Sequence, residues 1–295
     1  MPNTPAPRPG QNGRPVEAHQ TLGRRLRQLR ENRGWNVETA ARLLGWSTSK
    51  LSRLECGETS IKEPDMFRLL DLLSVSDLSQ RVAVRRLVRA LNDPQWWTDD
   101  KAVLGGWFAS YLALESVSHS IRTYEVRFIP GLLQTAEYAE AVISRRYRDP
   151  AQIRRRITTR MRRRQAVLDS GTQLWAIIDS AALDESFAGA AVMRRQIDFL
   201  IETARKHNVI IQILPLSGGI GAGIGTSFSM LRLHGAGIPD IVYLEHIDSA
   251  LFLTDADQSD SFRDAMEQLA IHACAPQSTQ AVLAGALNLL ERRPS

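Results

Sequence analysis

The apolar positions between residues 21 and 57 are spaced as in three short helices. Leu22, Leu26 and Leu29 lie three and four residues apart, which predicts a helix with one apolar face. A second apolar-faced helix follows, and the chain then turns at Gly45 into a third. Two short helices joined by a tight, glycine-containing turn form a helix-turn-helix.

The third helix carries the chemistry of a DNA-reading element. Asn36 and Ser47 precede the second and third helices, and both are good N-caps. Leu51 and Leu54 turn inward, whereas the other face carries short polar and basic groups that can hydrogen-bond base edges and contact phosphates. We therefore predict DNA contacts from Ser47, Thr48, Ser49, Lys50, Ser52, Arg53, Arg24 and Arg42.

The formal charge is concentrated in the same segment. Residues 21–57 hold eight Lys or Arg and three Glu, a net charge of +5, which equals the formal charge of the whole chain. All other residues therefore sum to zero. A local positive field on an otherwise neutral protein favours a phosphate-binding module over a helical hairpin with a solvated basic face.

The segment resembles the Cro/C1-type (XRE) helix-turn-helix. The positions that carry the resemblance are Leu26, Ala40, Ala41, Gly45, Ser47, Leu51 to Glu55 and Gly57. Val37 departs from the pattern, because this family often has a Gln there that braces the phosphate backbone. The resemblance implies a regulator that binds double-stranded DNA as a homodimer, with half-sites about 34 Å apart.

The remaining length predicts a second domain. A chain of 295 residues is too long for one helix-turn-helix, and this length favours about two domains. Residues 1–17 are rich in Pro, Gly and Asn, which is typical of a disordered tail and not of a signal peptide. Two further helices, one opened by Pro64-Asp65 and one over about 77–91, complete a helix-turn-helix domain spanning 18–94.

After residue 94 the pattern alternates between helical and strand periods. The run 208–214 is almost continuously apolar, as in a strand buried on both faces. We therefore predict a multi-domain chain, in which an all-α helix-turn-helix N-terminal domain is followed by an α+β regulatory domain over 95–291. The expected helices are 104–121, 135–143, 151–169, 192–206, 262–274 and 282–290, and the expected strands are 173–179, 208–214, 227–233, 240–245 and 250–253.

A second resemblance covers most of this region. It is similar to the C-terminal domain of unknown function in actinobacterial XRE regulators of the WhiJ-like, antitoxin-like family. That family implies a transcription factor whose C-terminal domain responds to a small protein partner or ligand. The alternative is an antitoxin-like interaction module that binds a small cognate protein, with DNA binding serving autoregulation. The matching blocks are FIPGLLQTAEYAEAVI, RMRRRQAVL, VMRRQIDFL, VIIQILPLSGG, GTSFSML and PDIVYLE.

Ten arginines lie between residues 145 and 164, with Asp149 as their only acidic neighbour. Such a cluster can contact flanking DNA, bind an acidic partner, or form a solvated helix face paired with acids elsewhere. We favour partner binding over DNA, because the cluster lies about a hundred residues beyond the DNA-reading helix. The residues assigned to it are Arg154, Arg155, Arg156, Arg162, Arg163 and Arg164.

No motif indicates catalysis, a cofactor or a metal. The loop Gly218–Gly225 lacks the Walker pattern and a correctly spaced GxGxxG, although it could cover a ligand pocket. Glu245, His246 and Asp248 lack an accompanying nucleophile elbow. Two distant cysteines and the lack of a long apolar span predict a cytoplasmic protein that does not enter a membrane.

Overall fold

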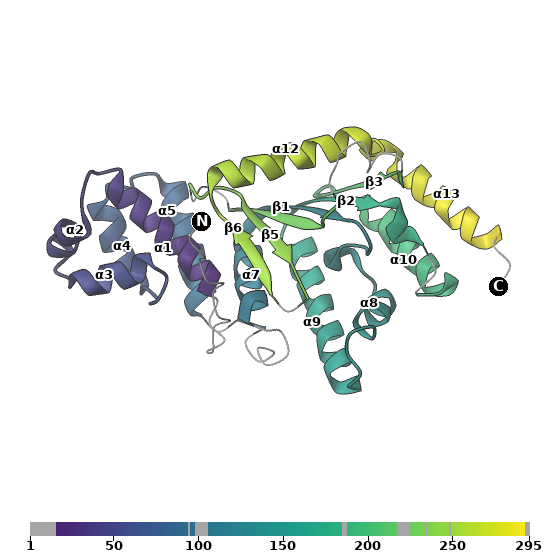
Figure 1. The fold of residues 1–295 in the computed structure, drawn as a ribbon, viewed down its shortest axis with the longest axis horizontal. Coiled ribbons are helices and arrows are strands. Elements are labelled where there is room, and N and C mark those ends of the chain that lie inside the picture. The colour runs from purple at the N-terminus through teal and green to yellow at the C-terminus, as the bar shows by residue number, and fades with distance from the viewer. Residues whose placement is uncertain are drawn as a thin grey trace, which may run out of the picture. The chain divides into compact units, whose positions relative to one another are not determined.

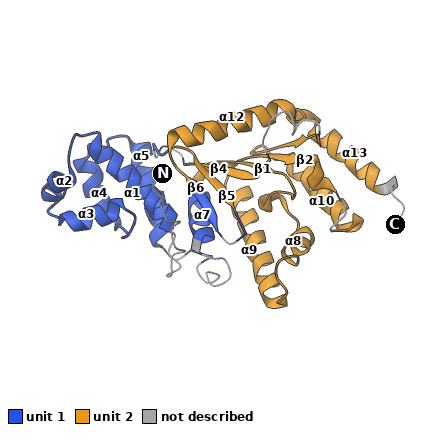
Figure 2. Cartoon of the chain, in the orientation of Figure 1, with its two compact units in different colours: residues 1–117, 233–238, 246–252 blue, residues 118–232, 239–245, 253–295 orange. Residues whose placement is uncertain are grey.

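The computed structural model describes residues 16–93, 95–97, 106–184, 188–216, 225–233, 235, 237–247 and 249–292. The chain divides into two compact units, which Figure 2 shows in different colours. The first comprises residues 1–117, 233–238 and 246–252, and the second comprises 118–232, 239–245 and 253–295. A helical N-terminal region followed by a mixed α/β domain confirms the predicted fold class.

The first unit begins with the predicted helices. Its helices are α1 (Val16–Glu31), α2 (Val37–Leu44), α3 (Thr48–Glu55), α4 (Glu63–Leu72), α5 (Leu78–Asn92) and α7 (Gly106–Val117). The Asn36 side chain accepts a hydrogen bond from Thr39 N, and Ser47 accepts one from Lys50 N, so both predicted N-caps are confirmed. Helix α1 starts at Val16, within the predicted tail of 1–17, and residues 1–15 lie outside the described residues.

The predicted helix over 104–121 was wrong at its C-terminal end. Helix α7 stops at Val117, and the chain continues directly into strand β1 (Ser118–Glu125). Every residue from Ala109 to Glu115 is buried, so α7 has no polar face to show where the helix ends. A nearly continuous apolar run does not distinguish a buried helix from a buried strand.

The second unit is built on five strands of a six-stranded sheet, whose sixth strand, β6 (Ala250–Leu253), consists mostly of first-unit residues. Strands β1, β2 (Gln173–Asp179) and β3 (Val209–Leu214) run parallel to one another, and β4 (Phe228–Leu233) and β5 (Ile241–Glu245) pair antiparallel. With β6, the strand order is β3-β2-β1-β4-β5-β6. Glu125 is the last residue of β1 and pairs with Ile178, which precedes the last residue of β2.

Helices cover both faces of this sheet. Figure 1 shows α12 along one face, with α8, α9 and α10 on the other. Met266 and Leu269 of α12 pack into a core with Tyr124, Ile177 and Phe228. The helices are α8 (Ala136–Ile143), α9 (Pro150–Asp169), α10 (Ala190–Thr203), α12 (Ala256–His272) and α13 (Thr279–Arg292), with short 3-10 turns at η2 (Gly131–Leu133), η3 (Ser180–Leu183) and η5 (Pro276–Ser278).

Strand β3 is less enclosed than its sequence predicts. The apolar run predicted a strand buried on both faces, yet β3 lies at the edge of the sheet and the side chain of Ile210 is 43% exposed. The other five residues of the strand, Val209 and Ile211 to Leu214, are buried. The apolar composition therefore predicted the strand and the burial of most of its side chains. Its position at the edge depends on the order of strands in the sheet, which a local sequence pattern does not encode.

Candidate nucleic-acid interface

The outer face of α3 is exposed and polar, as predicted. Thr48, Ser49, Ser52 and Arg53 are exposed, while Leu51 and Leu54 are buried beneath them. Ser49 and Arg53 are four residues apart, so their side chains lie on the same face of the helix. In the part of the chain that the structure describes, the Arg53 guanidinium has no ion-pair partner. The exposed face of α3 thus carries three hydroxyl groups, from Thr48, Ser49 and Ser52, and one guanidinium that can donate two hydrogen bonds to the same base.

Two of the predicted contact residues also have structural roles. The Ser47 hydroxyl accepts a hydrogen bond from Lys50 N at 3.1 Å and so caps the helix. Lys50 Nζ lies 2.8 Å from Asp65 Oδ2 of α4 and 3.9 Å from the centroid of the Trp46 ring. The Lys50 side chain is still 44% exposed. The Lys50 ammonium therefore links α3 to α4. The ion pair with Asp65 competes with any contact between Lys50 and a DNA phosphate.

Arg24 and Arg42 lie outside α3, on the two helices that pack against it. Arg24 belongs to α1 and Arg42 to α2, and both are exposed. Contacts between α1 and α3 and between α2 and α3 join the three helices into one body. The structure thus keeps both arginines exposed on neighbouring elements, where phosphate contacts are made in helix-turn-helix proteins.

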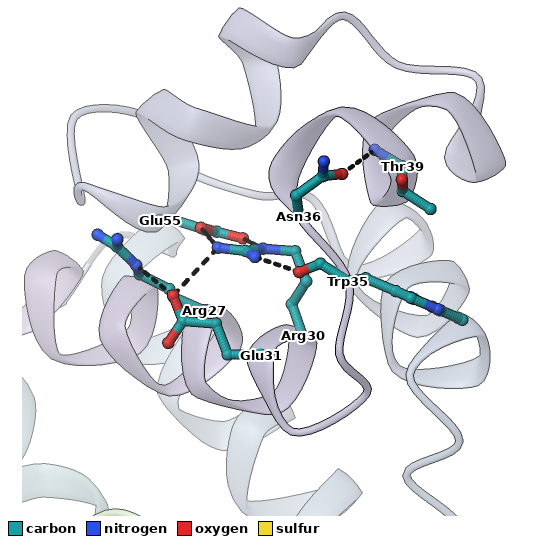
Figure 3. A network of polar contacts seen from close by, with 7 residues as sticks. All are labelled: Arg27, Arg30, Glu31, Trp35, Asn36, Thr39 and Glu55. Carbon is teal, nitrogen blue, oxygen red and sulfur yellow. Dashed lines mark hydrogen bonds and ion pairs between the residues drawn. The ribbon is translucent and has the colours of Figure 1, made fainter.

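A buried ion pair fixes the last turn of α3 (Figure 3). Arg30 of α1 donates from Nε to Glu55 Oε1 at 2.7 Å and from Nη2 to Glu55 Oε2 at 2.8 Å, which is a bidentate contact. The Arg30 and Glu55 side chains are only 7% and 5% exposed. Arg30 Nη1 also donates to the carbonyl oxygen of Trp35 at 2.6 Å. The Arg30 guanidinium therefore connects the end of α1, the segment just before α2 and the end of α3.

The hydrogen bonds from Arg30 to Glu55 raise the pKa of Arg30 above its ordinary value, so the group stays charged throughout the physiological range. This corrects one part of the charge argument. Arg30 is among the eight cations counted between 21 and 57, but it faces inward and is neutralised by Glu55. The net charge of the segment is unchanged, whereas the number of cations that can reach DNA is smaller.

Two glycines allow α1 and α3 to approach closely. A Cβ atom on Gly23 would lie 2.4 Å from the carbonyl oxygen of Glu55, and one on Gly57 would lie 2.5 Å from Gln20 N. Gly57 also has a φ of +74°, a conformation that other residues rarely adopt. Both contacts are with backbone, which cannot move aside as a flexible side chain can. The close approach brings Arg30 within reach of Glu55.

The structure separates the six arginines assigned to partner binding into two groups. All six lie on α9, but only Arg154, Arg155 and Arg162 are exposed, and these three have no ion-pair partner among the described residues. We call them the arginine surface. Arg156 lies 3.7 Å from the Tyr147 ring centroid, and Arg164 donates to the Gln134 carbonyl oxygen at 2.7 Å. Arg163, like these two, is partly buried.

Sequence reasoning missed the residues that position the site. Arg30 was counted only as a charge, and Glu55 only as part of a motif. Asp65 was noted only as a helix-start signal. An Arg and a Glu separated by 25 residues give no local periodic signal. The available signal was chemical, because each lies on the apolar side of its helix, next to Leu26 and Leu54. A charged residue at such a position indicates a buried partner.

Within the described residues, no group of three or more His, Cys, Asp or Glu side chains is placed to hold a metal ion. Among the same residues, no helix has both the length and the apolarity needed to cross a membrane. His246 and Glu245 are exposed, whereas Asp248 and most of the loop Gly218–Gly225 lie outside the described residues. The suggestion that this loop covers a pocket therefore stays a prediction.

Comparison with known protein families identifies both regions. A helix-turn-helix domain model matches residues 21–82, and a model described as a domain of unknown function (DUF5753) matches residues 108–285. The second match covers more than half of the chain, so the chain belongs to the DUF5753 family. No curated protein and no solved structure matches it. The helix-turn-helix match supports a DNA-binding regulator.

The buried ion pair gives a direct stability prediction. Glu55→Gln leaves the Arg30 charge buried without its counter-ion, so we expect the free energy of unfolding to fall by about 3–5 kcal/mol. Urea denaturation followed by circular dichroism and tryptophan fluorescence measures this change. The matched control is Asp71→Asn, which removes an exposed carboxylate of α4 that pairs with Arg81 and should have little effect. Equal losses in the two variants would contradict a structural role for the buried pair.

Proposed function

We propose that the protein is a sequence-specific, DNA-binding transcriptional regulator that is controlled through its C-terminal domain by a small protein partner or ligand. The observation that carries the proposal is the exposed face of α3, with Ser49, Ser52 and Arg53 on a helix whose last turn is fixed by Arg30 and Glu55. A rigid polar helix of this kind can enter a major groove and read base edges without first becoming ordered.

Resemblance to Cro/C1-type regulators and to WhiJ-like, antitoxin-like regulators supports the same proposal. In our proposal the C-terminal domain has no catalytic activity and requires neither cofactor nor metal, and the protein acts in the cytoplasm. The arginine surface favours a protein partner as the controlling signal, because three exposed cations on one helix form a docking site for acidic groups. It equally favours the alternative of an antitoxin-like module whose DNA binding serves autoregulation.

We expect Arg53 to read a guanine through its O6 and N7 atoms. Arg53→Ala should weaken binding to the preferred DNA sequence by about 1–3 kcal/mol and relax the preference at one base position. Selection from a random DNA library defines that sequence, and fluorescence anisotropy measures the affinities. Arg53→Lys keeps the charge but loses the bidentate geometry, so it should retain affinity for random DNA and lose discrimination.

The control for Arg53 is Arg86→Ala, which removes an exposed arginine from α5 of the same unit. This variant should bind both DNAs as the unmodified protein does. If Arg53→Ala weakens binding to the preferred sequence and to random DNA equally, Arg53 contacts phosphate only.

We also expect a homodimer. One recognition helix contacts few base pairs, and Cro/C1-type proteins reach useful affinity by pairing two half-sites about 34 Å apart. Multi-angle light scattering of the free protein and of its DNA complex measures the number of chains. A single chain in both samples would remove this part of the proposal.

The arginine surface distinguishes a protein partner from flanking DNA. In the triple variant of Arg154, Arg155 and Arg162 to Glu, we expect DNA affinity and its salt dependence to stay unchanged. Binding of an acidic protein that co-purifies from the native host should weaken, mainly through a slower association rate. If the three arginines contact phosphates instead, the slope of log affinity against log salt flattens by about three units.

The control for this experiment places a similar charge reversal elsewhere on the second unit. Arg205→Glu with Lys206→Glu changes two exposed cations after α10. This variant should bind both the partner and DNA normally. Loss of partner binding in the control as well would show that overall charge, and not the arginine surface, is responsible.

A further inference from the structure

Arg160 of α9 is a partly buried cation whose charge is not matched by a direct counter-ion. Its Nη1 donates to Gln134 Oε1 at 2.6 Å, and no carboxylate of the described residues forms an ion pair with it. A guanidinium has five N–H donors. Burial lowers the pKa of Arg160 to about 10, which still leaves the group charged near neutral pH. Burying a charge is costly unless a partner compensates for it, so a partner is expected.

The position of this guanidinium is fixed by its neighbours. Gln134 is only 3% exposed, and its Nε2 donates to the carbonyl oxygen of Ile129 at 2.7 Å. The Gln134 backbone carbonyl accepts a hydrogen bond from Arg164 at 2.7 Å. The donors of Arg160 are therefore held in place before any ligand binds, which reduces the entropy lost on binding.

A second guanidinium lies beside the first. A Cβ atom on Gly131 would lie 3.5 Å from Arg163 Nη1 and 3.8 Å from Arg160 Nε, so both groups reach the same point of the turn between β1 and α8. The charge of Arg163 contributes to the lowered pKa of Arg160. Two neighbouring cations repel each other, and an anion between or beside them relieves that repulsion.

Glu125 supplies a carboxyl group that can change charge at this place. The Ser227 hydroxyl accepts from Val126 N at 3.1 Å and is hydrogen-bonded to Glu125. Burial and the charge of Glu245 raise the pKa of Glu125 to about 7, against the attraction of Arg160 and Arg163. Burial raises the pKa of Tyr138 to about 12, and the charge of Glu125 adds to this rise. Near neutral pH this carboxyl is therefore partly protonated, so an anion can bind next to it without strong repulsion.

Arg160, Arg163 and Glu125 lie near the edge of the sheet at which parallel strands bind ligands. Glu125 ends β1, and the chain places β2 and β3 on one side of β1 and β4 on the other. In open α/β sheets, ligands bind outside the carboxyl ends of the parallel strands, and β1, β2 and β3 are parallel here. Topology and side-chain chemistry therefore indicate the same place.

We propose that Arg160, held by Gln134 and flanked by Arg163 and Glu125, binds the carboxylate or phosphate group of a small effector molecule. The effector role rests on the proposed regulatory function, whereas anion binding by itself does not. The two can be tested apart, because anion binding is measured on the full chain without DNA.

The test titrates the full-length protein with sulfate, which mimics a phosphate ester, and with acetate, which mimics a carboxylate. Isothermal calorimetry at constant ionic strength, set with chloride, measures affinity. We expect saturable binding of at least one of the two anions. Arg160→Gln should weaken it by roughly tenfold or more, since a charge-assisted hydrogen bond is lost. Arg205→Gln, which removes an exposed arginine just after α10, should leave it unchanged.

The pH dependence provides a second measurement, which does not require Arg160→Gln to fold. Protonation of Glu125 removes a negative charge next to the anion, so sulfate should bind more tightly one unit below the Glu125 pKa of about 7 than one unit above it. Glu125→Gln is neutral at every pH and should bind tightly at both. The proposal is overturned if neither anion binds saturably, if Arg160→Gln folds and binds normally, or if the pH dependence persists in Glu125→Gln.

Discussion

The bidentate contact between Arg30 and Glu55 is the constraint on which the DNA-binding unit depends. It is made by the last turns of α1 and α3, and its third hydrogen bond reaches the carbonyl of Trp35 before α2. All three segments of the helix-turn-helix therefore meet at one guanidinium. Because both charges are buried, loss of either leaves the other uncompensated, and the orientation of α3 is then no longer maintained.

Only residues without a side chain could bring these helices together. At Gly23 and Gly57 the backbones of α1 and α3 are so close that a Cβ atom would collide with backbone atoms. The glycines, the ion pair and the buried Leu26 and Leu54 thus act together, since each needs the spacing that the others set. The exposed residues Thr48, Ser49, Ser52 and Arg53 take no part in this frame, so they are available for DNA without any loss of support for α3.

The sequence predicted what is local and missed what depends on distant contacts. Caps such as Asn36 and Ser47 bond to residues three positions away, so their pattern is visible in the chain itself. The end of α7, the edge position of β3 and the pairing of Arg30 with Glu55 all depend on residues brought together by folding. The candidate site was predicted as a list of exposed polar residues, and its supporting frame was not.

The ten arginines between 145 and 164 show why charge alone does not assign a function. Helix α9 directs Arg154, Arg155 and Arg162 outward, while Arg160 and Arg164 turn toward the turn that follows β1 and hydrogen-bond to Gln134. An exposed arginine keeps its hydration, so it acts over long range and mainly accelerates encounter. A buried arginine has already lost its hydration, so a bound anion would compensate for its buried charge. In our proposal, one helix therefore contributes both to a docking surface and to a ligand site, because its exposed and buried arginines differ in hydration although they are the same residue type.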